Sequence, residues 1–200
     1  MSMKSMLDIN IMFCRHEFLN LSMSASELNK FLNNRCWSEI SKNEIRHYLT
    51  DDENRIEQTL NLAISNDTDF SWRAAWLIGK FAQSENEILK PHYLRIINAI
   101  EGKDSGHQRE LLKLVINKSL TDEEEGRLFE VCIRIWKDIH KKPGTRSYAF
   151  QCIDNIITTY PELRNELMGL FDPKYLETLS PAIRKTILMK LKSTDFNAVN

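Results

Sequence analysis

Side chains that could bind a metal ion or transfer a proton are scattered along this chain. No two of its five histidines have the i, i+4 spacing that places two ligands on one helix face; they are His16, His47, His92, His107 and His140. The motifs of phosphate-binding loops, dinucleotide folds, nucleophile elbows and zinc proteases do not occur, and six glycines leave little material for a phosphate cradle. We therefore expect no catalytic residues, no metal and no cofactor.

The densest acidic cluster, Asp122-Glu-Glu-Glu125, could be imagined as a metal site or an acid/base pair. It directly follows Thr121, which with Glu124 forms a capping-box pattern at a helix start. Carboxylates are favoured in a first helical turn because the helix dipole is positive there. We interpret the cluster as structural.

Four cysteines, Cys14, Cys36, Cys132 and Cys152, are far apart in the sequence and form no CxxC pair. We interpret them as reduced, mostly buried thiols. There is no continuous apolar signal segment and no run of eighteen apolar residues, so we expect a cytoplasmic protein without a membrane span.

Charge argues against a large nucleic-acid footprint, because the net charge is −1. The strongest local imbalance lies in residues 174–192, where five basic residues accompany one acidic residue. This segment could meet an acidic partner, or it could be a solvated face at the end of the fold.

A candidate partner-binding stripe lies in the segment 71–83, which is apolar around nearly its whole circumference. Its polar positions, Arg73, Lys80 and Gln83, form one narrow stripe that could reach a groove or a neighbouring element. We expect Trp72 and Trp76 to belong to the core, with a partner-binding surface as the alternative.

These residues must be positioned by helices, since apolar residues recur at intervals of three and four and strand patterns are almost absent. Capping boxes and N-terminal prolines mark the starts, and Asp172-Pro173 is interpreted as a turn. The predicted helices cover 24–34, 41–50, 52–65, 71–83, 86–101, 105–118, 122–140, 145–160, 162–170 and 180–192.

Pairing consecutive helices predicts units at 52–83, 86–118, 122–160 and 162–192. The second helix of each unit begins a few residues before an arginine, and these arginines, Arg73, Arg109, Arg146 and Arg184, are 36, 37 and 38 residues apart. With its motif Ser71-Trp-Arg-Ala-Ala-Trp76, the chain resembles the HEAT-like helical repeats of the armadillo superfamily over roughly residues 52–192.

The resemblance implies an all-α, right-handed superhelix of about four antiparallel helix pairs, with short capping helices before them. It also implies that an aspartate in the turn within a repeat pairs with the arginine of an adjacent repeat. Asp69 and Asp104 fit the aspartate position, and Arg109, Arg146 and Arg184 fit the arginine position. We expect one repeat domain over 23–200, preceded by a poorly ordered or docking tail over 1–22.

Proteins of this kind usually bind other macromolecules, so the resemblance favours a non-catalytic scaffold for a protein partner or a second copy. Nucleic acid is a less favoured partner. One alternative is a DNA-repair enzyme, because a group of HEAT-like proteins excises alkylated bases. Another is a lyase-associated protein, which would need a prosthetic group near a thiol such as Cys132 or Cys152.

Overall fold

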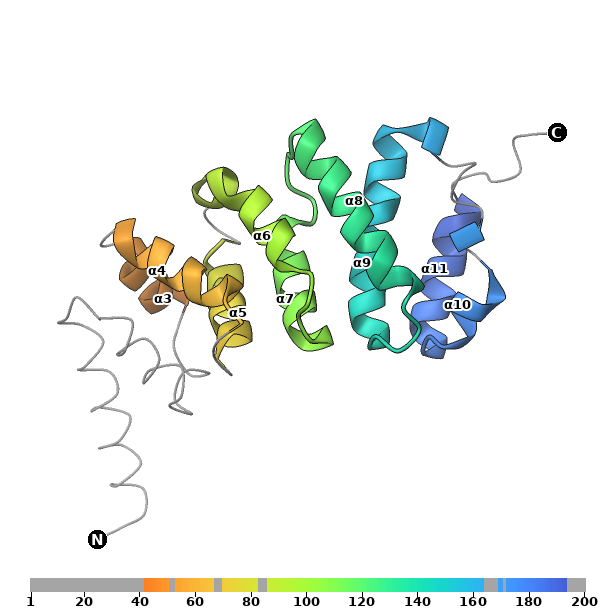
Figure 1. Cartoon of the computed structure of the whole chain (residues 1–200), viewed down its shortest axis with the longest axis horizontal. Coiled ribbons are helices and arrows are strands. Elements are labelled where there is room, and N and C mark those ends of the chain that lie inside the picture. Colours follow the sequence, from red (N-terminus) through yellow and green to blue (C-terminus); the bar gives the residue numbers. More distant parts are fainter. Residues whose placement is uncertain are drawn as a thin grey trace, which may run out of the picture. The chain divides into compact units, whose positions relative to one another are not determined.

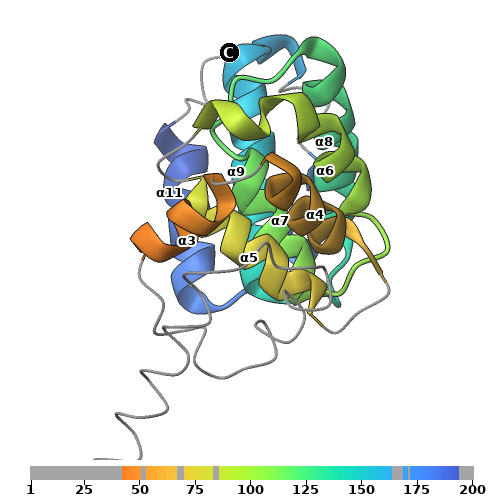
Figure 2. The ribbon, with the colours of Figure 1, turned by 90° about the vertical axis from the view of Figure 1, so that its left-hand side faces the viewer.

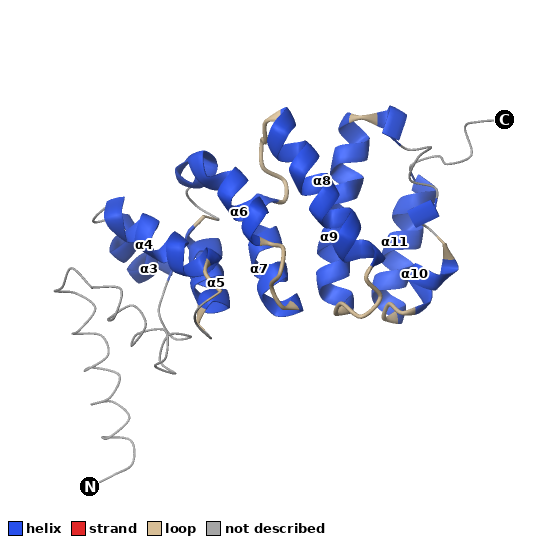
Figure 3. Cartoon of the chain, viewed as in Figure 1, coloured by secondary structure: helices blue, strands red, loops and turns tan. Residues whose placement is uncertain are grey.

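The structure is a computed structural model that describes residues 42–50, 53–66, 70–82, 86–163, 169–170 and 172–193. Every regular element in these ranges is a helix (Figure 3), which confirms the all-α prediction there. The expected tail over 1–22 and the predicted helix over 24–34 lie outside the described residues. The elements in order are α3 (Lys42–Thr50), α4 (Glu53–Ile64), α5 (Ser71–Phe81), the 3-10 helix η2 (Asn86–His92), α6 (Tyr93–Ala99), α7 (Ser105–Val115), α8 (Asp122–Lys137), α9 (Pro143–Thr159), α10 (Pro173–Glu177) and α11 (Pro181–Ser193).

The chain divides into two compact units after Lys90. In the N-terminal unit, α3, α4 and α5 pack against one another. Their contacts bury aliphatic side chains from all three helices, including Leu49, Leu60 and Leu77. Apolar residues at helical spacing thus produce the core of this unit, as the sequence pattern predicts.

The C-terminal unit has two layers of helices. The first helices of consecutive pairs, α6 and α8, pack against each other, and the second helices do the same, α7 against α9 and α9 against α11. Figure 1 shows the successive helix pairs of this unit side by side. Figure 2 shows α6 and α8 on one side with α7, α9 and α11 on the other. Each pair therefore buries its apolar surface against the next pair, which is how helical repeats stack.

Capping side chains fix where two of these helices start. Thr121 accepts a hydrogen bond from Glu124 N, and the Glu124 carboxylate accepts one from Thr121 N, so the predicted capping box of α8 is confirmed. At α7, the Asp104 carboxylate accepts from Gly106 N and His107 N. The acidic run Asp122–Glu125 is the first turn of α8, the position where the helix dipole favours negative charge.

The helix predicted over 86–101 is wrong in its first half. Residues Asn86–His92 form a 3-10 helix that contains Pro91, and the α-helix begins only at Tyr93. Proline has no N–H to donate and disfavours α geometry in the residue before it, so a regular α-helix cannot run through this position.

The helix predicted over 162–170 is also wrong where the chain is described. Residues 161–163 and 169–170 are in 3-10 turns, and the first helix of the last pair is α10, which starts at Pro173. Asp172 accepts from Lys174 N, so Asp172-Pro173 is an N-cap followed by proline at the first helical position. The same dipeptide fits a turn and a helix start equally well, since both use aspartate and proline for their local geometry.

Replacing Thr121 with alanine should lower the free energy of unfolding by about 1 kcal/mol, because the substitution leaves the Glu124 N–H without its capping acceptor. Urea denaturation followed by circular dichroism measures the change. Thr158→Ala is the matched control, because the exposed Thr158 hydroxyl bonds, among the residues that the structure describes, only to Asp154 O of its own helix. Equal losses in the two variants would show that the cap does not stabilise α8.

Candidate interaction surfaces

Helix α5 has one open face. Ser71, Ala74, Ala75, Leu77, Ile78 and Phe81 are buried, which accounts for most of its circumference. The remaining face carries Trp72, Arg73, Trp76 and Lys80, none of which is buried. Residues 72, 76 and 80 are each one turn apart, so they form a continuous stripe along the helix. Two of the predicted partner-binding residues, Arg73 and Lys80, therefore lie on one face, whereas Gln83 lies outside the described residues.

The cations of this face lie over aromatic rings. The Arg73 guanidinium carbon is 5.2 Å from the ring centre of Phe70 and 5.3 Å from that of Trp72. Lys80 Nζ is 5.4 Å from the ring centre of Trp76. Such stacking holds long cationic side chains in a defined place. We call Trp72, Arg73, Trp76 and Lys80 the α5 stripe.

The interpretation of Trp72 as a core residue is wrong, because 36% of the residue is exposed. Trp76 is partly exposed as well. Apolar residues occur around nearly the whole circumference of α5, so the sequence pattern assigned the large indoles to the core. Small residues, Ala74 and Ala75, occupy the buried positions instead.

Arg146 of α9 is the most deeply buried charged group that the structure describes, with 0% of the residue exposed. Its Nε donates to Trp136 O at 3.0 Å, Nη1 to Thr178 Oγ1 at 2.6 Å and Nη2 to Tyr175 O at 2.6 Å. The guanidinium also lies 4.9 Å from the ring centre of Trp136. Burial lowers the pKa of Arg146, and the nearby charge of Asp138 partly opposes this shift.

Arg184 of α11 also binds α10, the short helix that contains Tyr175. Its Nε donates to Leu176 O at 3.0 Å and its Nη2 to Glu177 O at 2.6 Å. The last carbonyls of any helix lack partners within the helix and carry its negative dipole end. Arg146 and Arg184 therefore act as side-chain caps for the C-terminus of α10, and Arg146 does so for α8 as well.

The predicted pairing of Asp104 with an arginine of an adjacent repeat is not what the structure contains. The Asp104 carboxylate caps its own helix α7, and it makes no ion pair within the described residues. Arg109, half exposed, binds Glu110 next to it, and Lys113 binds the same carboxylate. Asp69 lies outside the described residues. Arg109 thus binds a local glutamate, whereas Arg146 and Arg184 bind backbone carbonyls and, for Arg146, the Thr178 hydroxyl.

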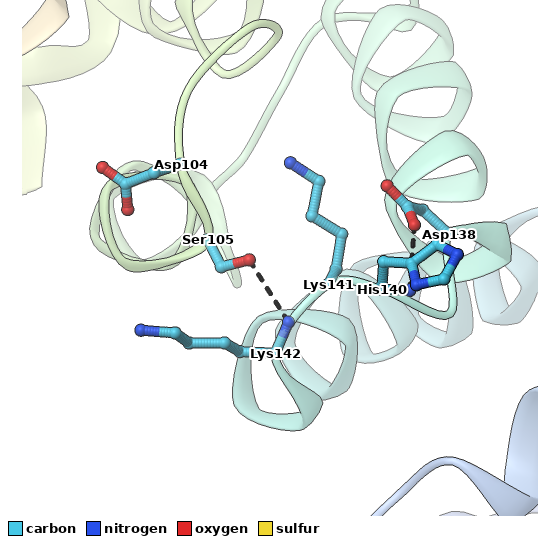
Figure 4. A pocket seen from close by; sticks show the side chains of 6 residues that line it. All are labelled: Asp104, Ser105, Asp138, His140, Lys141 and Lys142. Carbon is cyan, nitrogen blue, oxygen red and sulfur yellow. Dashed lines mark hydrogen bonds between the residues drawn. The ribbon is translucent and has the colours of Figure 1, made fainter.

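The turns within two consecutive repeats contact each other directly. Ser105 O accepts from Thr145 Oγ1 at 2.5 Å, Ser105 Oγ accepts from Lys142 N at 3.2 Å, and Lys103 O accepts from Lys141 Nζ at 3.3 Å. An open depression of about 550 Å³ lies at this junction, lined by Asp104, Ser105, Asp138, His140, Lys141 and Lys142 (Figure 4). Its two aspartates offset its two lysines, so it has no strong preference for an anion or a cation.

A polar network links α8 to Asn98 of α6 and to Glu101 in the turn after α6, and it was missed by the sequence reasoning. Arg127 donates to Asn98 Oδ1 at 2.8 Å and pairs with Glu101 at 2.5 Å, and Arg134 pairs with Glu101 at 2.7 Å. The i, i+7 spacing of Arg127 and Arg134 places both on one face of α8, which is a usable signal. The spacing does not identify the carboxylate that faces these arginines, because the choice of partner depends on how the helix pairs stack.

Groups that could carry chemistry are buried or separated. Trp136 is fully buried and donates to Leu170 O at 2.8 Å, so its indole cannot stack on an extruded base as a base-excising enzyme requires. Cys132 and Cys152 are both free and buried; burial, and then the hydrogen bond with Cys152, raise the pKa of Cys132 well above its usual value. A thiol in this state is a poor nucleophile. Within the described ranges, no three histidine, cysteine or acidic side chains gather as a metal site.

Replacing Arg146 with leucine should lower the free energy of unfolding by roughly 3–5 kcal/mol, since Trp136 O, Tyr175 O and the Thr178 hydroxyl would lose their buried donor. Arg146→Lys should also destabilise the protein, because an ammonium cannot reach three separate acceptors with a planar fork. Arg109→Ala is the control and should cost less than about 1 kcal/mol, because the Arg109 side chain is half exposed and Glu110 keeps its ion pair with Lys113. Urea denaturation of the three variants tests the ranking, and equal values for Arg146→Leu and Arg109→Ala would contradict it.

Comparison with known proteins agrees with this architecture. No helix in the described ranges is long and apolar enough to cross a membrane. No curated protein and no solved structure matches the chain. A family model described as the HEAT repeat domain matches residues 28–193, which is most of the chain. Together with the stacked helix pairs of the C-terminal unit, this match confirms the predicted helical-repeat fold: the chain belongs to the HEAT repeat domain family.

Proposed function

We propose that this protein is a non-catalytic scaffold that binds a protein partner through the α5 stripe. HEAT repeats commonly mediate contacts between proteins, and the family as a whole is generally non-catalytic. The observation that carries the proposal is the open face of α5, where two indoles and two cations lie on an otherwise buried helix.

The composition of the α5 stripe suits recognition of a protein. Tryptophan and arginine are the residue types that contribute most to binding energy at protein interfaces. Arg73 is held between Phe70 and Trp72, so little side-chain entropy is lost when it binds. Lys80 adds a positive charge beside the ring of Trp76, which favours a partner segment that presents carboxylates.

Trp72→Ala should weaken binding of the partner about tenfold or more, because the variant removes the most exposed aromatic side chain of the stripe. The partner is first captured from native cell extract on the immobilised full chain and identified by mass spectrometry. Its affinity for the purified wild type, Trp72→Ala, Arg73→Ala and Lys90→Ala is then measured by calorimetry. Lys90→Ala is the matched control, since it removes an exposed cation of the same unit that lies outside α5.

Two results would contradict the proposal. One is equal affinity of the captured partner for the wild type and for Trp72→Ala, with circular dichroism showing that the variant is folded. The other is turnover of a small-molecule substrate by the purified protein that is lost when an exposed carboxylate is replaced.

A further inference from the structure

Helix α11, the last helix that the structure describes, has two chemically different faces. Ile187 is buried toward α9, and Lys190 Nζ bonds to Asp154 Oδ2 of α9 at 2.7 Å, so this side holds the helix in the fold. At 3.6 residues per turn, Lys185 and Met189 lie on the opposite side, with Leu188 at its edge. Leu188 is 39% exposed and Met189 61% exposed. We call Lys185, Leu188 and Met189 the α11 face.

The charge near the α11 face is positive and poorly neutralised. Helix α11 contains Arg184, Lys185, Lys190 and Lys192 and no acidic residue. Lys190 is paired with Asp154, and the two bonds of Arg184 go to carbonyl oxygens, which carry no formal charge. Lys185 is exposed and has no carboxylate partner among the residues that the structure describes. The helix therefore attracts anionic groups to its outer side.

A solvated end cap does not explain this face. Terminal repeats of a stacked array need a polar outer surface to remain soluble, and lysines alone would provide it. Here two large apolar side chains are exposed in adjacent positions one turn after Lys185. Methionine is flexible and polarisable, so it adapts well to an apolar side chain of a partner.

The charge and the exposed apolar side chains of the α11 face distinguish between possible binding partners. A second copy packed symmetrically, α11 against α11, would bring lysines together, and like charges disfavour that interface. A membrane-surface helix needs a broad apolar face of large residues, whereas α11 uses Ile187 for its own core and exposes only Leu188 and Met189. Alternating cationic and apolar groups at helical spacing instead match an amphipathic helix that carries carboxylates beside aliphatic side chains.

We propose that the α11 face is a second protein-docking surface, whose occupant is an acidic amphipathic helix of a partner protein. Its aliphatic side chains would pack on Leu188 and Met189, and its carboxylates would pair with Lys185 and neighbouring cations of α11. This surface belongs to the C-terminal unit and the α5 stripe to the N-terminal unit, so their residues can be replaced independently.

Selection from a phage-displayed library of helical peptides tests the proposal without a known partner. The full chain is the target, and the double variant Lys185→Glu/Met189→Glu is used to remove peptides that bind elsewhere. We expect the surviving peptides to be enriched in Asp or Glu together with Leu, Ile or Phe at i, i+3 and i+4 spacing. For a synthesised survivor, each single variant should weaken binding about tenfold, since each removes one charge pair or one apolar contact.

Lys137→Glu is the matched control, because it makes the same charge change at an exposed lysine of α8 and should leave affinity unchanged. Survivors without acidic enrichment, or equal weakening by Lys185→Glu and Lys137→Glu, would overturn the proposal. It would also be overturned by Met189-dependent binding to phosphatidylserine vesicles or Met189-dependent self-association, with no peptide selected. A Trp72→Ala variant that binds the selected peptide normally would show that the two surfaces are independent.

Discussion

A buried guanidinium bound to neutral oxygen atoms determines how the C-terminal unit is held together. Arg146 lies where three helices meet, and its acceptors come from the end of α8 and the end of α10. Burying an arginine is costly unless every donor finds a partner, so the backbone around it must present carbonyls at the right places. Two carbonyls from the ends of α8 and α10 and the Thr178 hydroxyl accept one bond each from the guanidinium, without a carboxylate. Aromatic contact with Trp136, which itself contacts Phe150, completes the packing.

The helical pattern was predictable because it depends on residues close in sequence. Capping boxes, prolines at helix starts and apolar spacing act locally, which explains why α7, α8 and α9 match their predicted positions closely. The errors occur where one motif has two local meanings, as at Asp172-Pro173, or where a proline interrupts a favourable pattern, as at Pro91. Partners of long side chains could not be predicted in this way. The fold decides whether Arg146 meets an aspartate or a carbonyl, and the spacing of arginines contains no information about the acceptor.

The α5 stripe and the α11 face were likewise predictable only as far as local sequence determines them. A stripe containing Arg73 and Lys80 could be predicted from helical periodicity, since polar residues on an apolar helix indicate an open face. The indoles of Trp72 and Trp76 could not be assigned, because a tryptophan in an apolar helix fits a core as well as an interface. On α11, the excess of basic residues was visible in the sequence, but the burial of Ile187 and the exposure of Met189 required the packing of α11 on α9.

The shortness of α10 has a consequence for how such an array can change its length. A helix of five residues is too short to be stable alone, and α10 is held by an arginine before it in the chain and another after it. The last pair is therefore not an interchangeable module. A repeat inserted between α9 and α10 would separate Arg146 from its acceptors at α10, and removal of α11 would also remove the Arg184 bonds to α10. Because α10 depends on arginines from the helices on both sides of it, gain or loss of a repeat is far easier upstream of Arg146 than next to α10.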